Sequence, residues 1–252
     1  MFKLVTTNNE LLKKATNIAE NYANKQITNK TVGIVFLGGI ARNYFDHDAD
    51  IDIAIFENNE QTEVKIICEI IDGIEVQIFL ADYKSELNIK WDMSKRWAYS
   101  NNIIFCDTDG LIQKLLNNKV PLQNKERHTL MISGITLSEW YCNRLLDLWI
   151  RRGSLSSAHY MFNEGINHYF QAIFAYNHEL VADFKWRIFC ANNLPIKPKD
   201  FEKRITDIIE MHNNSLQELE RRRAVFLSLW NDTIPLIEKE VGMQYNEFKD
   251  TV

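Results

Sequence analysis

The sequence is poor in the features that define several classes of protein. None of its apolar runs approaches the length of about 20 residues that a membrane-spanning helix needs, and its first residues contain no apolar secretory core. The four cysteines are widely scattered, without the close spacing of a zinc site or a disulfide framework. Fixed-period repeats, low-complexity tracts and long linkers are also missing. We therefore expect a cytoplasmic, reduced protein with no membrane partner.

An excess of positive charge is also missing. The 252 residues include 29 Lys and Arg against 34 Asp and Glu, which gives a formal net charge of −5. No general basic field would therefore attract nucleic acid, which favours a small and cationic substrate over a polynucleotide. The chain is long enough for one large domain or two modest ones, each with a core of its own.

The hydrophobic pattern changes once along the chain. An amphipathic helix pattern comes first, and strand patterns follow near residues 32–37, 51–56, 63–71, 74–80 and 102–106. In the third strand pattern, Val64, Ile66, Cys68 and Ile70 share one side, and the turn signal Asp72-Gly73 ends the strand. Beyond about Gly110 only helical periods occur, near residues 111–118, 126–152, 155–180, 183–192, 199–212 and 214–241. Pro235 is expected to kink or split the last helix.

Mixed strands followed by helices alone predict an α+β fold with two parts. We expect a mixed sheet flanked by helices over residues 1–110 and an all-helical bundle over residues 111–252.

Chemistry is concentrated in residues 32–56. Asp50 and Asp52 stand two residues apart in an alternating strand, so both carboxylates project from one face. Glu75 occupies a polar position of a later strand, on the side opposite the apolar residues. Several carboxylates on adjacent strands are the arrangement that divalent metal ions need in phosphoryl and nucleotidyl transfer. We therefore predict that Asp50, Asp52 and Glu75 are both metal ligands and catalytic residues.

The apolar strand before these acids ends in a glycine pair. Gly38 and Gly39 let the backbone approach phosphate oxygens closely, and Arg42 is placed to cover their negative charge. We predict that these residues bind a nucleotide.

The segments Leu37-Gly38-Gly39, Asp50-Ile51-Asp52 and Ile74-Glu75-Val76 together resemble the nucleotidyltransferase superfamily that shares the DNA polymerase β catalytic fold. The resemblance covers about residues 1–110. It implies two Mg²⁺ ions bound by the three acids, with ATP or another NTP as the donor and a hydroxyl group as the acceptor. The stretch from Gly38 to Arg42 also looks like the Gly-Ser-x-Ala-Arg form of small bacterial members, with Gly39 in place of the commoner serine.

A second resemblance lies in the helical part. Ala175-Tyr176-Asn177, Lys185-Trp186 and Leu194-Pro195 are similar to the helical substrate-binding domain of lincosamide- and aminoglycoside-type nucleotidyltransferases and their uncharacterised relatives. This implies an antibiotic-like small acceptor, with Lys185 at the nucleotide phosphates. It also implies a general base from the helical half, for which Glu139 and Glu164 are unranked candidates.

Other interpretations stay open. Asp46, Asp48, Asp50 and Asp52 have the spacing of a calcium loop, but Ile51 stands where that loop needs glycine, so we interpret Asp46 and Asp48 as solvated loop residues. Arg42 and Lys185 are also compatible with plain surface positions. Transfer to a protein or a tRNA, as in toxin–antitoxin relatives, is one alternative function, and a nucleotide-binding module without turnover is another. The acceptor, the preferred nucleotide and the oligomeric state are left open.

Overall fold

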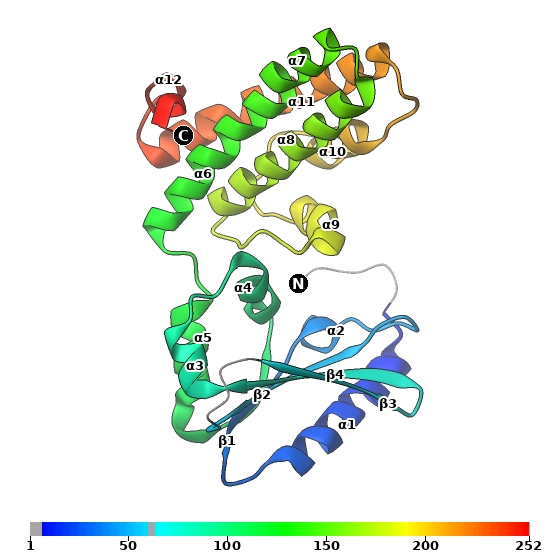
Figure 1. Ribbon diagram of the computed structural model, residues 1–252, viewed down its shortest axis with the longest axis vertical. Coiled ribbons are helices and arrows are strands. Elements are labelled where there is room, and N and C mark those ends of the chain that lie inside the picture. Colours follow the sequence, from blue (N-terminus) through cyan, green and yellow to red (C-terminus); the bar gives the residue numbers. More distant parts are fainter. Residues whose placement is uncertain (1–6, 60–63, 252) are drawn as a thin grey trace. The chain divides into compact units, whose positions relative to one another are not determined.

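The chain forms two compact units, Met1–Pro121 and Leu122–Val252. The computed structural model describes residues 7–59 and 64–251 (Figure 1). In these ranges, every helix is too short or too polar to cross a bilayer.

A five-stranded sheet forms the centre of the first unit, with the strand order β3-β4-β2-β1-β5. The strands are β1 (Thr31–Phe36), β2 (Ile51–Glu57), β3 (Lys65–Ile71), β4 (Ile74–Asp82) and β5 (Ile103–Asp107). β2 and β4 are parallel, and the other neighbours are antiparallel. The predicted mixed sheet is confirmed. Glu63, the first residue of the expected third strand, lies outside the described residues.

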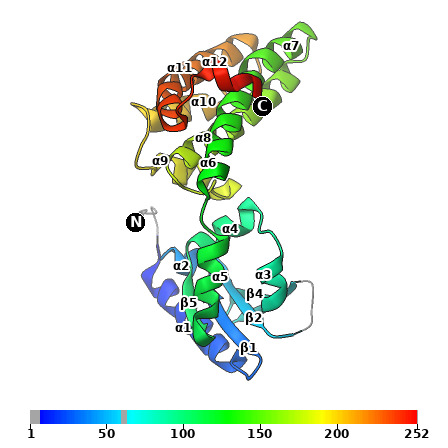
Figure 2. The same ribbon diagram turned by 90° about the vertical axis from the view of Figure 1, so that its left-hand side faces the viewer.

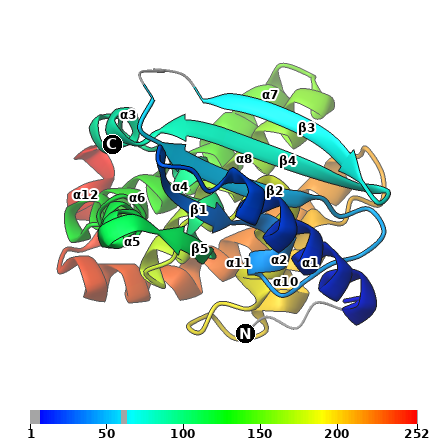
Figure 3. The same ribbon diagram turned by 90° about the horizontal axis from the view of Figure 1, so that it is seen from below.

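One face of the sheet is covered by α1 (Asn9–Gln26), which Figure 3 shows running across the strands. Ala15, Ile18 and Ala19 of this helix pack with the strand residues Ile34 and Ile53. The Asn8 side chain caps the helix by accepting hydrogen bonds from the backbone N–H groups of the first turn.

The first unit also contains the short helix α2 (Gly38–Ala41), followed by α3 (Tyr83–Asn88), α4 (Met93–Ser100) and α5 (Leu111–Lys119). Figure 2 shows α5 lying along β5 and β1. Ile112, Leu115 and Leu116 of α5 join the core over the second face of the sheet. The first unit therefore extends to Pro121, beyond the range 1–110 that the sequence pattern suggested, because α5 is buried against the sheet.

The second unit contains only helices in its described residues, in agreement with the predicted helical part. They are α6 (Asn124–Glu139), a π-helix (Trp140–Leu145), α7 (Leu146–Arg151), α8 (Leu155–Tyr176), α9 (Arg187–Asn192), α10 (Phe201–Ile209), α11 (Leu216–Val241) and α12 (Tyr245–Phe248), with short 3-10 turns between some of them. Pro235 does not split the last helix, because α11 continues through this residue. The core includes Tyr169, whose hydroxyl is hydrogen-bonded to the Thr233 hydroxyl at 2.8 Å.

Candidate functional site

Parallel pairing of β2 and β4 brings the predicted acids to one region of the sheet. Asp52 lies opposite Gln77, and Asp50, which directly precedes β2, is two residues away on the same face. The Gln77 Nε2 atom donates to Asp50 Oδ2 at 3.0 Å and to Glu75 Oε1 at 3.0 Å. One neutral amide therefore holds two carboxylates together. Gln77 was not predicted as a site residue, although it follows Glu75 by two residues and shares its face.

Gly38 lies in close contact with Asp52. The Leu37 N–H donates to the Asp52 carbonyl oxygen at 3.0 Å, which fixes the end of β1 beside β2. Gly38 has a φ of +59°, and a Cβ atom at this position would lie 2.0 Å from Asp52 Oδ2. Glycine is therefore required here both by the backbone conformation and by the space that the carboxylate occupies.

Gly39 is enclosed by the turn that follows it. The Tyr44 N–H donates to the Gly39 carbonyl at 2.9 Å, and a Cβ atom at Gly39 would lie 2.6 Å from the Tyr44 carbonyl oxygen. This turn has no room for the serine that is commoner in the resembling family. The departure at Gly39 therefore has a local structural reason.

Arg42 directly follows the short helix α2 (Gly38–Ala41). Its guanidinium contacts two residues of the first unit, Gly38 and Trp97. Its Nη1 donates to the Gly38 carbonyl at 3.1 Å, and its Nη2 donates to the Trp97 carbonyl at 3.3 Å. The guanidinium also stacks over the Trp97 ring, 4.2 Å from its centroid. These contacts tie the glycine turn to α4, and the phosphate-binding role of Arg42 stays a prediction.

Asp46 organises the loop before β2. It accepts a hydrogen bond from the Tyr44 hydroxyl, and its Oδ1 accepts one from the Asp48 N–H at 2.9 Å. The Tyr44 hydroxyl is the chief reason that the pKa of Asp46 is below its usual value. Asp46 is thus a structural residue and not simply a solvated one, whereas Asp48 is exposed. A helix-flanked calcium loop is excluded because β2 occupies the place of its second helix.

A cavity of about 390 Å³ opens beside the acids in the first unit. Asp50 and Glu75 both line it, together with Asp46, Asp48 and Asp72. Its other lining residues are Leu11, Lys14, Phe45, His47, Ala49, Ile70, Gly73 and Ile74. Five carboxylates against one lysine make the lining strongly acidic.

The arrangement of Asp50 and Glu75 suits a metal ion that is also bound by substrate phosphates better than a metal ion bound by protein side chains alone. Within residues 7–59 and 64–251, no three His, Cys, Asp or Glu side chains are grouped closely enough to hold an ion. However, Mg²⁺ in phosphoryl-transfer enzymes is usually bound by one or two carboxylates together with substrate phosphates. Asp50 and Glu75, which already converge on one donor, suit that second arrangement. The expected pair of Mg²⁺ ions stays a prediction.

The remaining predicted residues lie in the second unit. Lys185 is exposed in the 3-10 turn Phe184–Trp186, where its N–H donates to Asp183 Oδ1 at 3.2 Å. Glu139 accepts a hydrogen bond from Asn143 Nδ2 at 2.8 Å. Glu164 favours the charged form of His168, whose pKa is nevertheless lowered by burial. The roles of Lys185, Glu139 and Glu164 at the acid cluster stay predictions.

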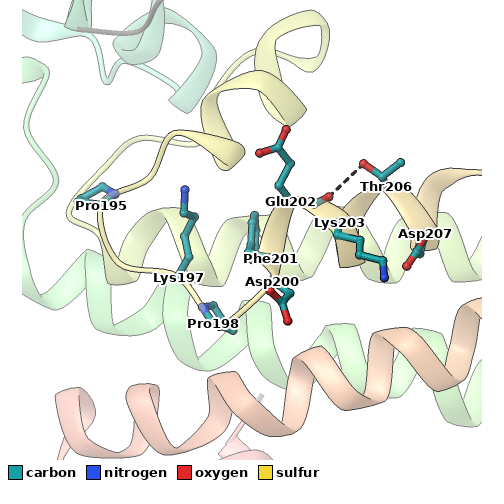
Figure 4. Close-up of a pocket in the computed structure, with 9 residues that line it drawn as sticks. All are labelled: Pro195, Lys197, Pro198, Asp200, Phe201, Glu202, Lys203, Thr206 and Asp207. Atoms are coloured by element: carbon teal, nitrogen blue, oxygen red, sulfur yellow. Dashed lines mark hydrogen bonds between the residues drawn. The ribbon is translucent and has the colours of Figure 1, made fainter.

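A cavity of about 670 Å³ lies in the second unit, along α10 (Figure 4). It is lined by Pro195, Lys197, Pro198, Asp200, Phe201, Glu202, Lys203, Thr206 and Asp207. Thr206 Oγ1 is occupied in donating to the Glu202 carbonyl at 3.0 Å. The lining mixes both charge signs and includes none of the predicted site residues.

Among the comparisons with known proteins, the one with solved structures gives a similarity. No protein-family model matches the chain. No curated protein matches it either. A crystal structure of a nucleotidyltransferase-like protein from Exiguobacterium sibiricum 255-15 is similar, with a TM-score of 0.49 and 13% sequence identity. The similarity covers 92% of this chain and 78% of that one. At this identity and TM-score, the similarity supports no particular activity or substrate.

Proposed function

We propose that this chain is a Mg²⁺-dependent nucleotidyltransferase that moves a nucleoside monophosphate, AMP from ATP, onto a hydroxyl group. The observation that carries the proposal is the pairing of Asp50 and Glu75 through Gln77 on parallel strands. A second observation supports the proposal: Gly38, just after β1, lies in close contact with Asp52. A sheet face with converging carboxylates beside a glycine turn suits the chemistry of a metal-bound polyphosphate.

Asp50, Asp52 and Glu75 would hold Mg²⁺ together with the phosphate oxygens of the nucleotide, and the bound ion would neutralise phosphate charge and align the reacting oxygen atoms. Gln77 keeps Asp50 and Glu75 at one position by donating to both. Gly38 and Gly39 present backbone without side chains, and Arg42 and Lys185 are the cations proposed to contact the triphosphate.

In the proposed reaction, the acceptor oxygen forms a bond to the α-phosphorus as the bond from this phosphorus to the bridging oxygen breaks. Pyrophosphate leaves, and the hydroxyl proton passes to a base. Glu139 and Glu164 are the proposed candidates for that base. They differ in setting, because Glu139 is bonded to Asn143 and Glu164 lies near His168.

The lining of the 390 Å³ cavity suggests the class of acceptor. Its carboxylates, including Asp46, Asp48 and Asp72, would attract a cation and repel an anion. We therefore propose a small acceptor that carries both hydroxyl and amino groups, similar in chemistry to an aminoglycoside or a lincosamide.

The test is nucleotide transfer by the full chain. The protein is incubated with α-labelled NTPs and Mg²⁺, first with a set of amino sugars and amino alcohols and then with cell lysate. We expect a labelled small molecule and released pyrophosphate, and we expect a loss of about 10³-fold in Asp50→Asn with Asp52→Asn. Asp48→Asn, in the same loop, is the matched control and should retain transfer.

Three outcomes would contradict the proposal. A labelled protein or tRNA would replace the small acceptor with a macromolecule. Bound ATP without pyrophosphate release for any acceptor would indicate a nucleotide-binding module. Transfer that is unchanged in the double variant would remove the acid cluster from the mechanism.

A further inference from the structure

The strand β3 is one of the two edges of the sheet and has a neighbour, β4, on one side. It is a regular strand without a bulge in its pairing with β4 and without proline. Natural edge strands are commonly protected by bulges, prolines or covering elements, because an open edge can pair with another strand. Here Ile66 is 60% exposed, Ile70 is 71% exposed, and Val64 and Cys68 are also exposed. Among the described residues, no strand pairs with the outer side of β3, so this edge combines open backbone groups with exposed apolar side chains.

The backbone of β3 alternates between groups that point toward β4 and groups that point outward. Asp72 and Gly73, both with positive φ, form a two-residue turn, so the closing pair Ile71 and Ile74 exchanges both hydrogen bonds. Hydrogen-bonded pairs recur at every second residue, so the backbone groups of Lys65, Ile67 and Glu69 also form hydrogen bonds to β4. The N–H and C=O groups of Ile66, Cys68 and Ile70 therefore point to the open edge, and the same alternation continued one residue beyond β3 places those of Val64 there.

One antiparallel register between two copies of this strand satisfies both the backbone and the charges. If Ile67 faces its own equivalent, Ile66 faces Cys68 of the second copy and Val64 faces Ile70. These are the residues with outward backbone groups, so they form the hydrogen-bonded pairs. Lys65 then faces Glu69 of the second copy in a pair without backbone hydrogen bonds, where side chains are closest. Two-fold symmetry forms this Lys–Glu pair twice.

We propose that two copies of this chain associate by antiparallel pairing of their β3 strands, centred on Ile67. The exposed Ile66 and Ile70 are then covered by the apolar side chains of the second strand. Glu69 also contacts the Tyr22 hydroxyl of its own chain, which holds this carboxylate on the α1 face. Ile70 is paired with Glu75 and Cys68 with Gln77, so the covered apolar stripe lies on the face that carries the acids. Both acid clusters of the dimer would open on the same face of one continuous sheet.

The test is sedimentation of the full chain under reducing conditions over a range of concentrations. We expect a concentration-dependent species of twice the monomer mass of 29.6 kDa. Lys65→Glu and Glu69→Lys should each weaken dimerisation at least fivefold, because each places like charges opposite one another at two symmetric positions. The double variant restores both pairs and should return to within threefold of the wild-type affinity. Ile103→Lys, an exposed position on the opposite edge strand β5, is the control and should have no effect.

A disulfide tests the register independently of these charge changes. Paired residues in a hydrogen-bonded antiparallel position have Cα atoms about 5.5 Å apart, within the range that a disulfide spans. Ile66→Cys should therefore cross-link to Cys68 of the second copy on oxidation, and the wild-type chain should not. A chain that stays monomeric at all concentrations would overturn the proposal, as would a dimer whose affinity does not change in Lys65→Glu and Glu69→Lys. A double variant that does not regain affinity, or a wild-type chain that cross-links through Cys68, would also overturn it.

Discussion

Single residues decide the shape of the acid cluster, and the decisive ones are uncharged. Gln77 joins Asp50 to Glu75, while Gly38 and Gly39 let the backbone fold against Asp52 and Tyr44. The acids themselves could be predicted, because the two-residue period of a strand places them on one face. Gln77 and the reason for Gly39 could not, because they depend on the register of β2 against β4 and on a turn whose conformation the sequence pattern does not reveal.

Replacing Gln77 with glutamate should make the cluster depend on cations. The Gln77→Glu change removes the shared donor and adds a fourth negative charge to Asp50, Asp52 and Glu75, and a cost of about 1 kcal/mol would lower the Tm by about 2–4 °C. Thermal melts with and without Mg²⁺ measure the effect, and Mg²⁺ should raise the Tm of the variant more than that of the wild type. Gln217→Glu, an exposed position in α11, is the control. Equal Mg²⁺ responses would contradict the described geometry.

Restoring the commoner serine at Gly39 should damage the fold. Because a Cβ atom would lie 2.6 Å from the Tyr44 carbonyl oxygen, the turn must shift, at a cost of about 1–3 kcal/mol. Urea unfolding measures this cost, with Ala41→Ser in the same short helix as the control. A Gly39→Ser variant as stable as Ala41→Ser would show that the turn is not closed as described.

At the scale of elements, periodicity indicated strands and helices well but did not choose the buried face of β3. Val64, Ile66, Cys68 and Ile70 share one side as predicted, yet that side is exposed, while Ile67 and Ile71 pack against the core. Both faces of this strand carry isoleucine, so hydrophobic alternation gives no preference. The choice depends on α1, which covers the other face of the sheet. The short helices α3 and α4 were missed between strands, and the sequence left open whether Pro235 would kink or split the last helix, which is α11 without a split.

The junction of α8 and α11 should make stability depend on pH. Buried His159 Nδ1 and Arg222 Nη1 lie 3.1 Å apart, and Arg222 also donates to Asn163 Oδ1 at 2.7 Å. Burial first, and then the Arg222 charge, lowers the pKa of His159, against smaller opposing effects of Glu218 and the Ser215 backbone. The unfolded chain binds the proton near the usual pKa of about 6.5, so stability is complete above that pH and falls as the pH drops below it.

Urea unfolding at pH 8 and pH 5.5 measures this loss. His159→Gln should reduce the difference between the two pH values but not abolish it, because burial also lowers the pKa of His168. His47→Gln, at an exposed position, is the control and should leave the difference unchanged. A His159→Gln variant with the wild-type pH dependence would remove His159 as its source.

On the scale of the whole molecule, each compact unit contains a core of its own, and the first ends at Pro121. The change from strand to helix patterns near Gly110 indicated two parts, but it could not show that α5 packs on the sheet. The assignment of α5 to the first unit depends on Ile112, Leu115 and Leu116, which pack in the core of that unit. In the sequence, these residues only indicate the apolar face of an amphipathic helix and do not show which core the face contacts.

Two fragments test the extent of the first unit. Residues 1–121 should unfold cooperatively on their own, because both faces of the sheet keep their helices. Residues 1–110 lose the burial of three apolar side chains, at a cost of about 5–8 kcal/mol, which is comparable to the whole stability of a domain. Far-UV circular dichroism with thermal melting distinguishes them. A 1–110 fragment that melts like 1–121 would show that α5 contributes little to this core.

The central claim is that Asp50, Asp52 and Glu75 hold a metal-bound nucleotide, and calorimetric titration of the full chain with a non-hydrolysable ATP analogue tests it without knowledge of the acceptor. We predict binding that requires Mg²⁺, falls at least tenfold in Asp50→Asn, Asp52→Asn and Glu75→Gln, and is retained in Asp48→Asn. Binding of equal strength in all four variants, or binding that is indifferent to Mg²⁺, would contradict the claim.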